Sequence, residues 1–467
     1  MNDYSSLKRD NSCGKQDSCI SCTQYDQCTK WAAFIEKHGY KKKYSHFDKR
    51  TSLQDFKTLN KIMNPDWITH HGFWPFIHYQ KDLTRYNRHQ GRKSKKRDIR
   101  YCSHIDRCIY QRYGFLLNEY YNQYALTHEI DESCIAYRTN KNKSNIDYAK
   151  IAFDFIDRSE RCYILVCDFS KFFDYIDHRI LKQNLCDILN QEYLPSDYYA
   201  VYKSITKYSS WSWKSLLQIN NLSTSKRARK KMNSKETVLS KHEFRQHAKQ
   251  CITKNTNQYG IPQGSPLSAV LSNIYMIHFD KLLTAKVREL DGLYLRYCDD
   301  ILIILPFIPS LEKQIQRDMK DIYNLIQSYK YTKINTDKTK LLKFDLLSSS
   351  VISSFDNQTR EFVPGGQINY LGFIYDGKTK RIRRKSITKY YRRMHGKVKN
   401  AIYKNNYKNV YGLYTQRSHQ IRQGSTFIDY ARRASKVLSL DDPEANNLIK
   451  HNVEKVAKAK NRYKHTS

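Results

Sequence analysis

Two adjacent aspartates between two apolar segments set the strongest limit on how this chain folds. Asp299 and Asp300 follow residues 293–297 and precede residues 301–305, and both flanking segments are largely apolar. Short apolar runs bounded by polar residues are typical of buried strands. We therefore predict two strands joined by a turn that carries both carboxylates. An ordinary exposed turn is the alternative. The apolar flanks argue against it, because adjacent like charges repel each other where no cation compensates them.

A third aspartate, Asp168, ends another predicted strand. Residues 163–168 are rich in apolar and β-branched side chains, which is typical of a buried strand. Hard divalent cations take carboxylate oxygens as ligands. Two such ions, about 3.5–4 Å apart, can hold the attacking and leaving oxygens of a nucleotidyl transfer. Asp168 and the pair Asp299 and Asp300 are therefore candidate ligands for two ions. Taken alone, Asp168 is equally well explained as a residue of a turn after a strand.

The charge of the chain predicts a polyanionic partner. Lysine and arginine number 82 against 45 acidic residues, which gives a net charge of +37. Such an excess attracts nucleic acid first and an anionic membrane surface second. The apolar stretch 301–309 is too short to span a membrane, and the N-terminus has no apolar signal core. We therefore expect no membrane association and a cytoplasmic protein whose thiols stay reduced.

Five segments, in order along the chain, resemble the motifs of the reverse-transcriptase family. They are Val166–Phe173, Gly260–Ser268, Tyr297–Asp300, Asn335–Lys340 and Asn369–Phe373. Each segment is short, but the ordered set is specific, and the resemblance covers residues 96–376. The motifs are most similar to bacterial enzymes of the group II intron and retron lineage. Residues 136–138 and 143–145, together with Cys298, resemble the defence-associated "unknown group".

The resemblance implies a two-metal site. Asp168 and Asp299 would bind two Mg²⁺ ions, Asp300 would support them, and the backbone carbonyl of Phe169 would add a ligand. Lys338 would lie near the pyrophosphate as a proton donor or counter-charge. A solvated lysine in a basic segment is the alternative for Lys338.

The same resemblance implies residues that bind the substrate. Phe173 would be a steric gate that collides with a ribose 2′-hydroxyl and so selects deoxynucleotides; the neighbouring Phe172 could equally be that residue. Gln263 and Gly264 would approach the incoming nucleotide and template, since glycine permits a close backbone approach. Tyr297 belongs to the same substrate-binding set.

Three arginines are candidates for gripping triphosphate and template. They are Arg97, Arg107 and Arg138, and a guanidinium recognises phosphate bidentately. A solvated basic face is the alternative, above all for Arg97 within the basic run 91–100. Arg107 and Arg138 stand in more apolar surroundings, where an unpaired charge is costly, and this favours a functional role.

Four cysteines near the N-terminus form a possible metal site. Cys13, Cys19, Cys22 and Cys28 follow the spacing C-x5-C-x2-C-x5-C. Four thiolates can hold Zn²⁺ tetrahedrally, although the outer spacings are unusual for zinc. Free thiols in a small helical cap are the alternative.

The expected fold is α+β, a right-hand polymerase with fingers, an antiparallel-sheet palm and a helical thumb. The sheet topology is implied by the resemblance, and residues 370–375 are predicted to add one strand. Four regions are expected: a basic, cysteine-containing extension (1–90), fingers (91–160), palm (161–376, with a basic insertion at about 205–259), and a helical basic thumb with the C-terminal tail (377–467).

The expected function is RNA-directed DNA synthesis by two-metal nucleotidyl transfer. The partners would be an RNA template, deoxynucleoside triphosphates and the DNA product. The resemblance to defence-associated enzymes implies that the template is a noncoding RNA and that the role is antiphage. Two alternatives remain: an RNA-directed RNA polymerase, and an RNA-binding scaffold or maturase with a relic palm.

Overall fold

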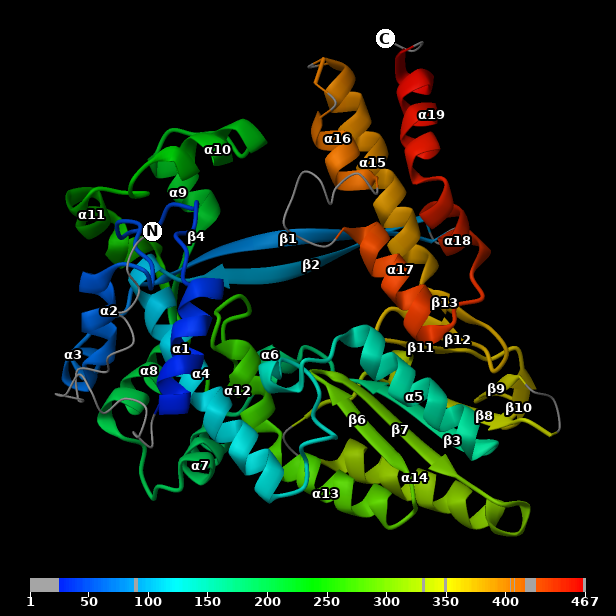
Figure 1. Ribbon diagram of the computed structural model, residues 1–467. Coiled ribbons are helices and arrows are strands. Elements are labelled where there is room, and N and C mark those ends of the chain that lie inside the picture. The colour runs from blue at the N-terminus through cyan, green and yellow to red at the C-terminus, as the bar shows by residue number, and fades with distance from the viewer. Residues whose placement is uncertain are drawn as a thin grey trace. The chain divides into compact units, whose positions relative to one another are not determined.

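The computed structural model describes residues 25–87, 91–329, 332–347, 351–403, 405–406, 408–415 and 426–464 (Figure 1). The chain forms two compact units. The first contains Met1–Asp131, Ser170–Lys281 and Tyr329–Lys333, and the second contains Glu132–Phe169, Leu282–Ser328 and Ile334–Ser467.

The first unit is mainly helical and contains one sheet. Its helices are α1 (Tyr25–His38), α2 (Phe56–Met63), α3 (Pro65–Thr69), α4 (His104–Thr127), α6 (Phe172–Tyr175), α7 (His178–Leu189), α8 (Ser196–Thr206), α9 (Trp213–Ile219), α10 (Lys226–Ser234), α11 (Lys241–Cys251) and α12 (Ser268–Tyr275). Helix α13 (Ile277–Arg288) crosses the boundary between the two units in the sequence. The long helix α4 begins where the Ser103 side chain accepts a hydrogen bond from the Asp106 N–H, a typical N-cap.

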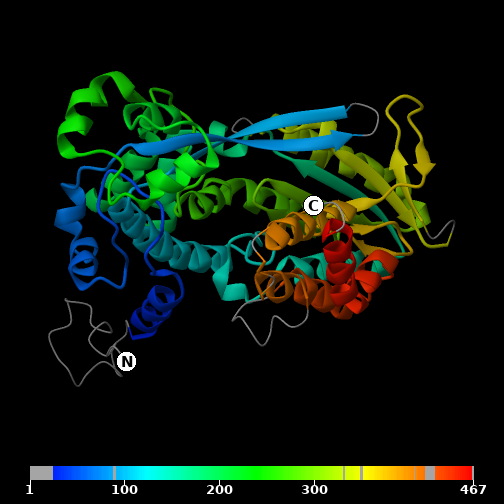
Figure 2. The same ribbon diagram turned by 90° about the horizontal axis from the view of Figure 1, so that it is seen from above.

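The sheet of the first unit is built on a long antiparallel hairpin. Its strands are β1 (Phe76–Asn87), β2 (Gly91–Tyr101), β4 (Ser209–Ser212) and β5 (Ile252–Lys254), in the order β2-β1-β4-β5. Figure 2 shows β1 and β2 as the two extended neighbouring strands. The predicted insertion at 205–259 supplies β4 and β5 to this sheet and also contains α9, α10 and α11. Its helices close a core around Trp211 and Met232.

The second unit is built on a six-stranded antiparallel sheet. Its order is β10-β9-β8-β3-β7-β6. The strands are β3 (Arg161–Asp168), β6 (Leu293–Tyr297), β7 (Asp300–Pro306), β8 (Lys340–Asp345), β9 (Ile352–Phe355) and β10 (Phe362–Pro364). A smaller antiparallel sheet contains β11 (Ile368–Tyr370), β12 (Phe373–Tyr375) and β13 (Lys380–Ile382). The strands predicted at 163–168, 293–297 and 301–305 are confirmed by β3, β6 and β7.

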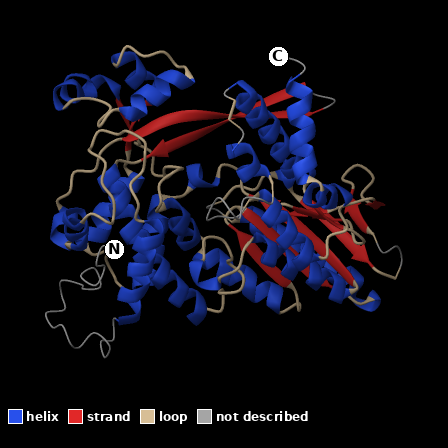
Figure 3. Cartoon of the chain, turned by 45° about the horizontal axis from the view of Figure 1, so that its top comes forward, coloured by secondary structure: helices blue, strands red, loops and turns tan. Residues whose placement is uncertain are grey.

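Figure 3 shows helices packed against the large sheet. Helices α5 (Asn145–Ser159) and α14 (Glu312–Ser328) contact its strands. The second unit also contains α15 (Arg384–Tyr403), α16 (Lys408–Tyr414), α17 (Phe427–Leu438), α18 (Pro443–Lys450) and α19 (Asn452–Lys464), with short 3₁₀ turns η2 (Thr139–Lys141), η3 (Pro309–Leu311) and η4 (Thr336–Lys338). Helices α15, α16 and α19 share a separate core. Side chains alternate between the faces of a strand. Ile164 of β3 packs in the core formed with α5, whereas Tyr163 donates a hydrogen bond to Glu312 of α14. The two helices therefore lie on opposite faces of β3.

One predicted strand is wrong in its detail. Residues 370–375 form a hairpin, because β11 ends at Tyr370 and β12 begins at Phe373, and these two residues pair with each other. Leu371 and Gly372 both have positive φ angles (47° and 99°) and make the turn. An apolar run with one glycine fits either a strand or a tight hairpin, and the pattern alone does not distinguish them.

The α+β fold class is confirmed by the mixture of helices and antiparallel sheets. The four domain boundaries stay a prediction. Among the described helices, none combines the length and the apolar character that crossing a membrane requires.

Candidate active site

The turn between β6 and β7 carries two of the predicted carboxylates. Tyr297 pairs with Asp300, so Cys298 and Asp299 alone form the turn. Cys298 has a φ of 61°. A two-residue hairpin favours positive φ at its first turn position, where glycine is the usual residue. The predicted hairpin is therefore confirmed, and its turn contains a non-glycine residue in a left-handed conformation, which is uncommon.

Strand β3 brings the third carboxylate to the same place. Asp168, the last residue of β3, pairs directly with Asp300, the first residue of β7. The Phe169 N–H donates to the Asp299 carbonyl at 3.1 Å, and the Asn335 N–H donates to the Asp168 carbonyl at 2.7 Å. The backbone thus fixes both acid-bearing segments beside each other at one end of the sheet.

The three carboxylates differ in their surroundings. Asp168 is buried, Asp299 is half-buried, and Asp300 is exposed. Although Asp300 is exposed, partial loss of water around its carboxylate and the charge of Asp299 raise the pKa of Asp300 to about 6, and Arg383 opposes this shift. A neighbouring cation lowers such a pKa, because it stabilises the ionised form. Asp299 and Asp300 therefore form a pair whose mutual repulsion a bound cation would relieve.

Lys338 lies at Asp168. Its ammonium group, at the end of η4, forms an ion pair with the Asp168 carboxylate. The side chain of Lys338 is 48% exposed and that of Asp168 is 10% exposed. The sequence predicted Lys338 near the pyrophosphate. In this structure its charge neutralises the buried aspartate.

The oxygen atoms at this end of the sheet fit a divalent cation. Carboxylates from adjacent strands provide the hard ligands that Mg²⁺ prefers. Within the described part of the chain, no three histidine, cysteine, aspartate or glutamate side chains already converge as a complete metal-binding group. Lys338 instead compensates part of the negative charge.

In the first unit, the two adjacent phenylalanines differ in exposure. Phe172 is 5% exposed and packs against Tyr275 at a ring-centroid distance of 6.2 Å. Phe173 is half-buried, and its carbonyl accepts a hydrogen bond from the Ile261 N–H at 2.9 Å. The structure therefore makes Phe172 the core aromatic and leaves Phe173 as the more accessible ring.

The loop before α12 is fixed on strand β2. The Arg100 N–H donates to the Gln263 carbonyl at 2.9 Å, and Ser268 donates to the Pro262 carbonyl at 2.7 Å. Gly264 has a φ of 125°, and a Cβ atom there would lie 2.6 Å from the Arg100 carbonyl oxygen. Only glycine allows this close approach of the loop to β2.

A comparison with protein families identifies the chain. The family model described as "Reverse transcriptase (RNA-dependent DNA polymerase)" matches residues 87–375. The chain belongs to the reverse-transcriptase family. This membership supports a nucleotidyltransferase of the reverse-transcriptase type, and reverse-transcriptase domains generally use divalent metal ions. No curated protein matches the sequence.

Among solved structures, the chain is similar to telomerases from two Candida species at low identity. Apo telomerase from Candida tropicalis, truncated from its C-terminal domain, is 13% identical, with 76% of this chain and 68% of that chain covered and a TM-score of 0.38. Telomerase from Candida albicans in complex with a TWJ fragment of telomeric RNA is 14% identical, with 96% and 77% covered and a TM-score of 0.39.

The three arginines predicted to bind phosphate lie in different surroundings. Arg97 is exposed on β2, opposite Lys81 of β1. Arg107 is 4% exposed and donates to the Gln111 side chain at 2.7 Å and to the Thr51 carbonyl at 3.1 Å. These contacts stabilise the buried charge of Arg107 within its own unit, and its contact with phosphate stays a prediction.

Arg138 and Arg296 support the backbone next to the hairpin between β6 and β7. Arg138 is buried and donates to the Cys134 carbonyl at 3.1 Å. Arg296 is fully buried and donates to the Cys298 carbonyl at 3.0 Å and to the Cys134 sulfur at 2.9 Å. Sequence reasoning missed Arg296. The available signal was an arginine in the centre of an otherwise apolar strand.

Tyr137 is a second residue that sequence reasoning did not assign to the hairpin. Its ring lies 6.3 Å from that of Tyr297, and its pKa is raised by burial and by the neighbouring Cys298.

The predicted zinc ligands lie mostly outside the described residues. Cys13, Cys19 and Cys22 are outside the residues that the structure describes, whereas Cys28 is on α1. The zinc site stays a prediction.

Proposed function

We propose that this protein is an RNA-directed DNA polymerase whose reaction takes place at the paired ends of β3 and β7. The observation that carries the proposal is the pairing of Asp168 with Asp300, which gathers three acids around one two-residue turn in a chain of the reverse-transcriptase family. Asp168 and Asp299 would hold Mg²⁺, with Asp300 and the carbonyl of Phe169 in support. Bound Mg²⁺ would lower the pKa of the primer hydroxyl and stabilise the leaving pyrophosphate.

The side chains at this site would position the substrates and neutralise their negative charge. Lys338 would leave Asp168 when cations bind, and its ammonium group would then be available to donate a proton or charge to the leaving group. Tyr297 would contact the substrate beside the turn. In the first unit, Phe173 would exclude a 2′-hydroxyl, and Gln263 and Gly264 would approach the nascent base pair. Arg97, Arg107 and Arg138 would contact template or triphosphate.

The proposed partners are an RNA template, deoxynucleoside triphosphates and a DNA product. A net charge of +37 favours such partners, and contacts to phosphates make binding fall steeply with salt. We assign the template to a noncoding RNA and the role to antiphage defence in the bacterial cytoplasm, because residues 136–138 and 143–145 resemble defence-associated enzymes. The regions 1–90, 91–160, 161–376 and 377–467 would act as extension, fingers, palm and thumb, and Cys13, Cys19, Cys22 and Cys28 would bind Zn²⁺.

Removal of the negative charges of Asp299 and Asp300 tests the proposed polymerase activity. Asp299→Asn combined with Asp300→Asn keeps the size of both side chains, and we expect it to abolish extension of a primer on an RNA template while RNA binding persists. Asp321→Asn is the matched control, because Asp321 is exposed on α14 of the same unit. Extension by the double variant at the wild-type rate would overturn the proposal.

Two further measurements separate the alternatives. If the protein makes RNA, the wild type will incorporate ribonucleotides at least as well as deoxynucleotides. A gate at Phe173 predicts that Phe173→Ala raises ribonucleotide incorporation. If the protein is a scaffold, protection against phage will survive in the double aspartate variant. An antiphage role through a noncoding RNA requires that deletion of the neighbouring noncoding DNA also removes protection.

A further inference from the structure

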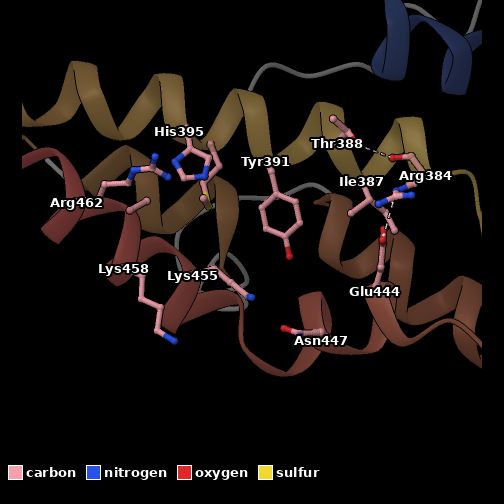
Figure 4. Close-up of a pocket in the computed structure, with 12 residues that line it drawn as sticks. Arg384, Ile387, Thr388, Tyr391, His395, Glu444, Asn447, Lys455, Lys458 and Arg462 are labelled. Atoms are coloured by element: carbon pink, nitrogen blue, oxygen red, sulfur yellow. Dashed lines mark hydrogen bonds and ion pairs between the residues drawn. The ribbon is translucent and has the colours of Figure 1, made fainter. Parts of the chain in front are cut away.

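A cavity of about 510 Å³ lies between the last helices of the second unit. Helices α15, α18 and α19 supply its lining, which Figure 4 shows in close-up. This volume is within the range of about 300–1,000 Å³ that small-molecule sites occupy. The cavity shares no residue with the carboxylate site.

Positive charge dominates the lining. Four cationic side chains, Arg384, Lys455, Lys458 and Arg462, stand against one carboxylate, Glu444. Glu444 is paired with Arg384 at 3.4 Å. Lys455, Lys458 and Arg462 follow one another at intervals of three and four residues, so they share one face of α19. An anion held in the cavity would reduce the repulsion among them.

The rest of the lining includes apolar, aromatic and amide side chains. Ile387, Met394 and Ala459 are buried and form an apolar base. The half-buried Tyr391 projects from α15 across the cavity, toward the Asn447 side chain on α18 (Figure 4). A surface that binds only phosphates needs neither an aromatic ring nor an amide. Aromatic rings stack on unpaired bases, and an amide both donates to and accepts from base edges.

His395 adds a polar atom to the same wall. It lies on α15 and lines the cavity. Its Nδ1 is buried and has no hydrogen-bond partner among the described residues. Buried nitrogen atoms are normally hydrogen-bonded, so a ligand or a water molecule is the expected partner.

We propose that this cavity binds one nucleotide, with the base against Tyr391 and Asn447 and the phosphate against Lys455, Lys458 and Arg462. The nucleotide is either free or part of a single-stranded nucleic acid. A regular duplex does not fit, because its bases are stacked and inaccessible to a side chain within a cavity. The site is independent of DNA synthesis, so it stands or falls separately from the polymerase.

Photocrosslinking tests the base contact. The full chain is irradiated with a uridine decamer that contains 4-thiouridine, and the crosslinked peptide is identified by mass spectrometry. We expect a crosslink on α15 at Tyr391. Stacking contributes about 1–3 kcal/mol per base, so Tyr391→Ala should weaken decamer binding by roughly 5- to 150-fold, whereas Tyr391→Phe should retain it. No crosslink at Tyr391 together with unchanged affinity of Tyr391→Ala overturns the proposal.

Charge reversal tests the phosphate contact. Lys458→Glu removes a lining cation, and Lys397→Glu is the matched control, because Lys397 is exposed on α15 and does not line the cavity. Equal loss of decamer binding in both variants would show only a solvated basic face and would overturn the proposal. Thermal unfolding verifies that each variant is folded.

Three competitors distinguish the possible ligands. Uridine monophosphate that displaces the decamer from the Tyr391 crosslink identifies a free nucleotide as a ligand, whereas displacement by unlabelled decamer alone identifies single-stranded nucleic acid. A blunt RNA–DNA duplex that displaces it equally well overturns the proposal. Because the readout requires no polymerisation, an inactive polymerase leaves it unaffected.

Discussion

Replacement of Arg296 by methionine removes the charged group that supports the hairpin between β6 and β7. The Arg296 guanidinium is fully buried and donates to the Cys298 carbonyl at 3.0 Å. A hydrogen bond to a charged group contributes about 1.5–3 kcal/mol. The left-handed conformation of Cys298 (φ 61°) costs about 1–2 kcal/mol. The two energies are of similar size, so loss of the arginine is sufficient to let the turn relax.

A relaxed turn moves Asp299, which is the other residue of that turn. A displacement of about 1 Å in an active site can lower the rate by roughly 100-fold. We therefore expect Arg296→Met to lower kcat by about 100-fold, to raise the Mg²⁺ concentration needed for half-maximal activity, and to change the KM for the template-primer little.

Primer extension at varied Mg²⁺ and template-primer concentrations measures these effects, with thermal unfolding alongside. Arg317→Met is the matched control, because Arg317 is exposed on α14 of the same unit. A variant that unfolds more easily but keeps the wild-type kcat and Mg²⁺ dependence would show that Arg296 only stabilises the fold. This result would refute the coupling between the buried guanidinium and the carboxylate.

Three further predictions concern backbone strain and buried titratable groups. Cys298→Val should lower the free energy of unfolding in urea by about 1–2 kcal/mol, because a β-branched residue disfavours positive φ, whereas Cys298→Gly removes that strain. Gly264→Ala should destabilise the loop before α12 by about 1–3 kcal/mol, seen as faster proteolysis there, because its Cβ would meet a backbone carbonyl at 2.6 Å. Burial lowers the pKa of His46 to about 3 and of His104 to about 4, and raises that of Asp48 to about 6. The two histidines contribute to stability above pH 6.5, and this contribution is lost as the pH falls. Asp48 and Asp300 act in the opposite sense below pH 6. The free energy of unfolding at pH 5 should therefore be about 1–3 kcal/mol lower than at pH 7.5, measured by thermal unfolding.

The sequence predicts those parts of the fold where a local pattern of apolar and polar residues is compatible with only one local structure. The two segments that flank Asp299 and Asp300 are largely apolar and show no alternation with polar residues. Because both segments end at the two acids, a buried hairpin is the interpretation that fits the pattern. Residues 370–375 have an equally apolar pattern, but the positive φ of Leu371 converts it into a turn. Leucine is not a turn signal, and the left-handed conformation depends on the pairing of β11 with β12.

The pairing of strands across the sheet could not be predicted from the local sequence pattern either. The neighbouring position of Asp168 and Asp300 depends on the register between β3 and β7, which are separated by more than a hundred residues of sequence. The sequence shows which strands end in acids, but the register follows from how all six strands pack.

The buried arginines show why charge is the hardest property to place from sequence. An arginine in a basic chain is expected at the surface, and the apolar surroundings of Arg107 favoured a phosphate contact on the ground that a buried charge needs a partner. In the structure the charge of Arg107 has two partners in its own unit, Gln111 and a backbone carbonyl, and the phosphate contact stays a prediction. Arg296 follows the same rule, with Cys298 as its acceptor. Arg107 is held by a side chain one turn further along α4 and by the Thr51 carbonyl, and Arg296 donates to a carbonyl of the turn; the two backbone acceptors depend on tertiary structure. The two arginines therefore differ only in what they hold: Arg107 supports the interior of a unit, whereas Arg296 supports the turn on which the proposed chemistry depends.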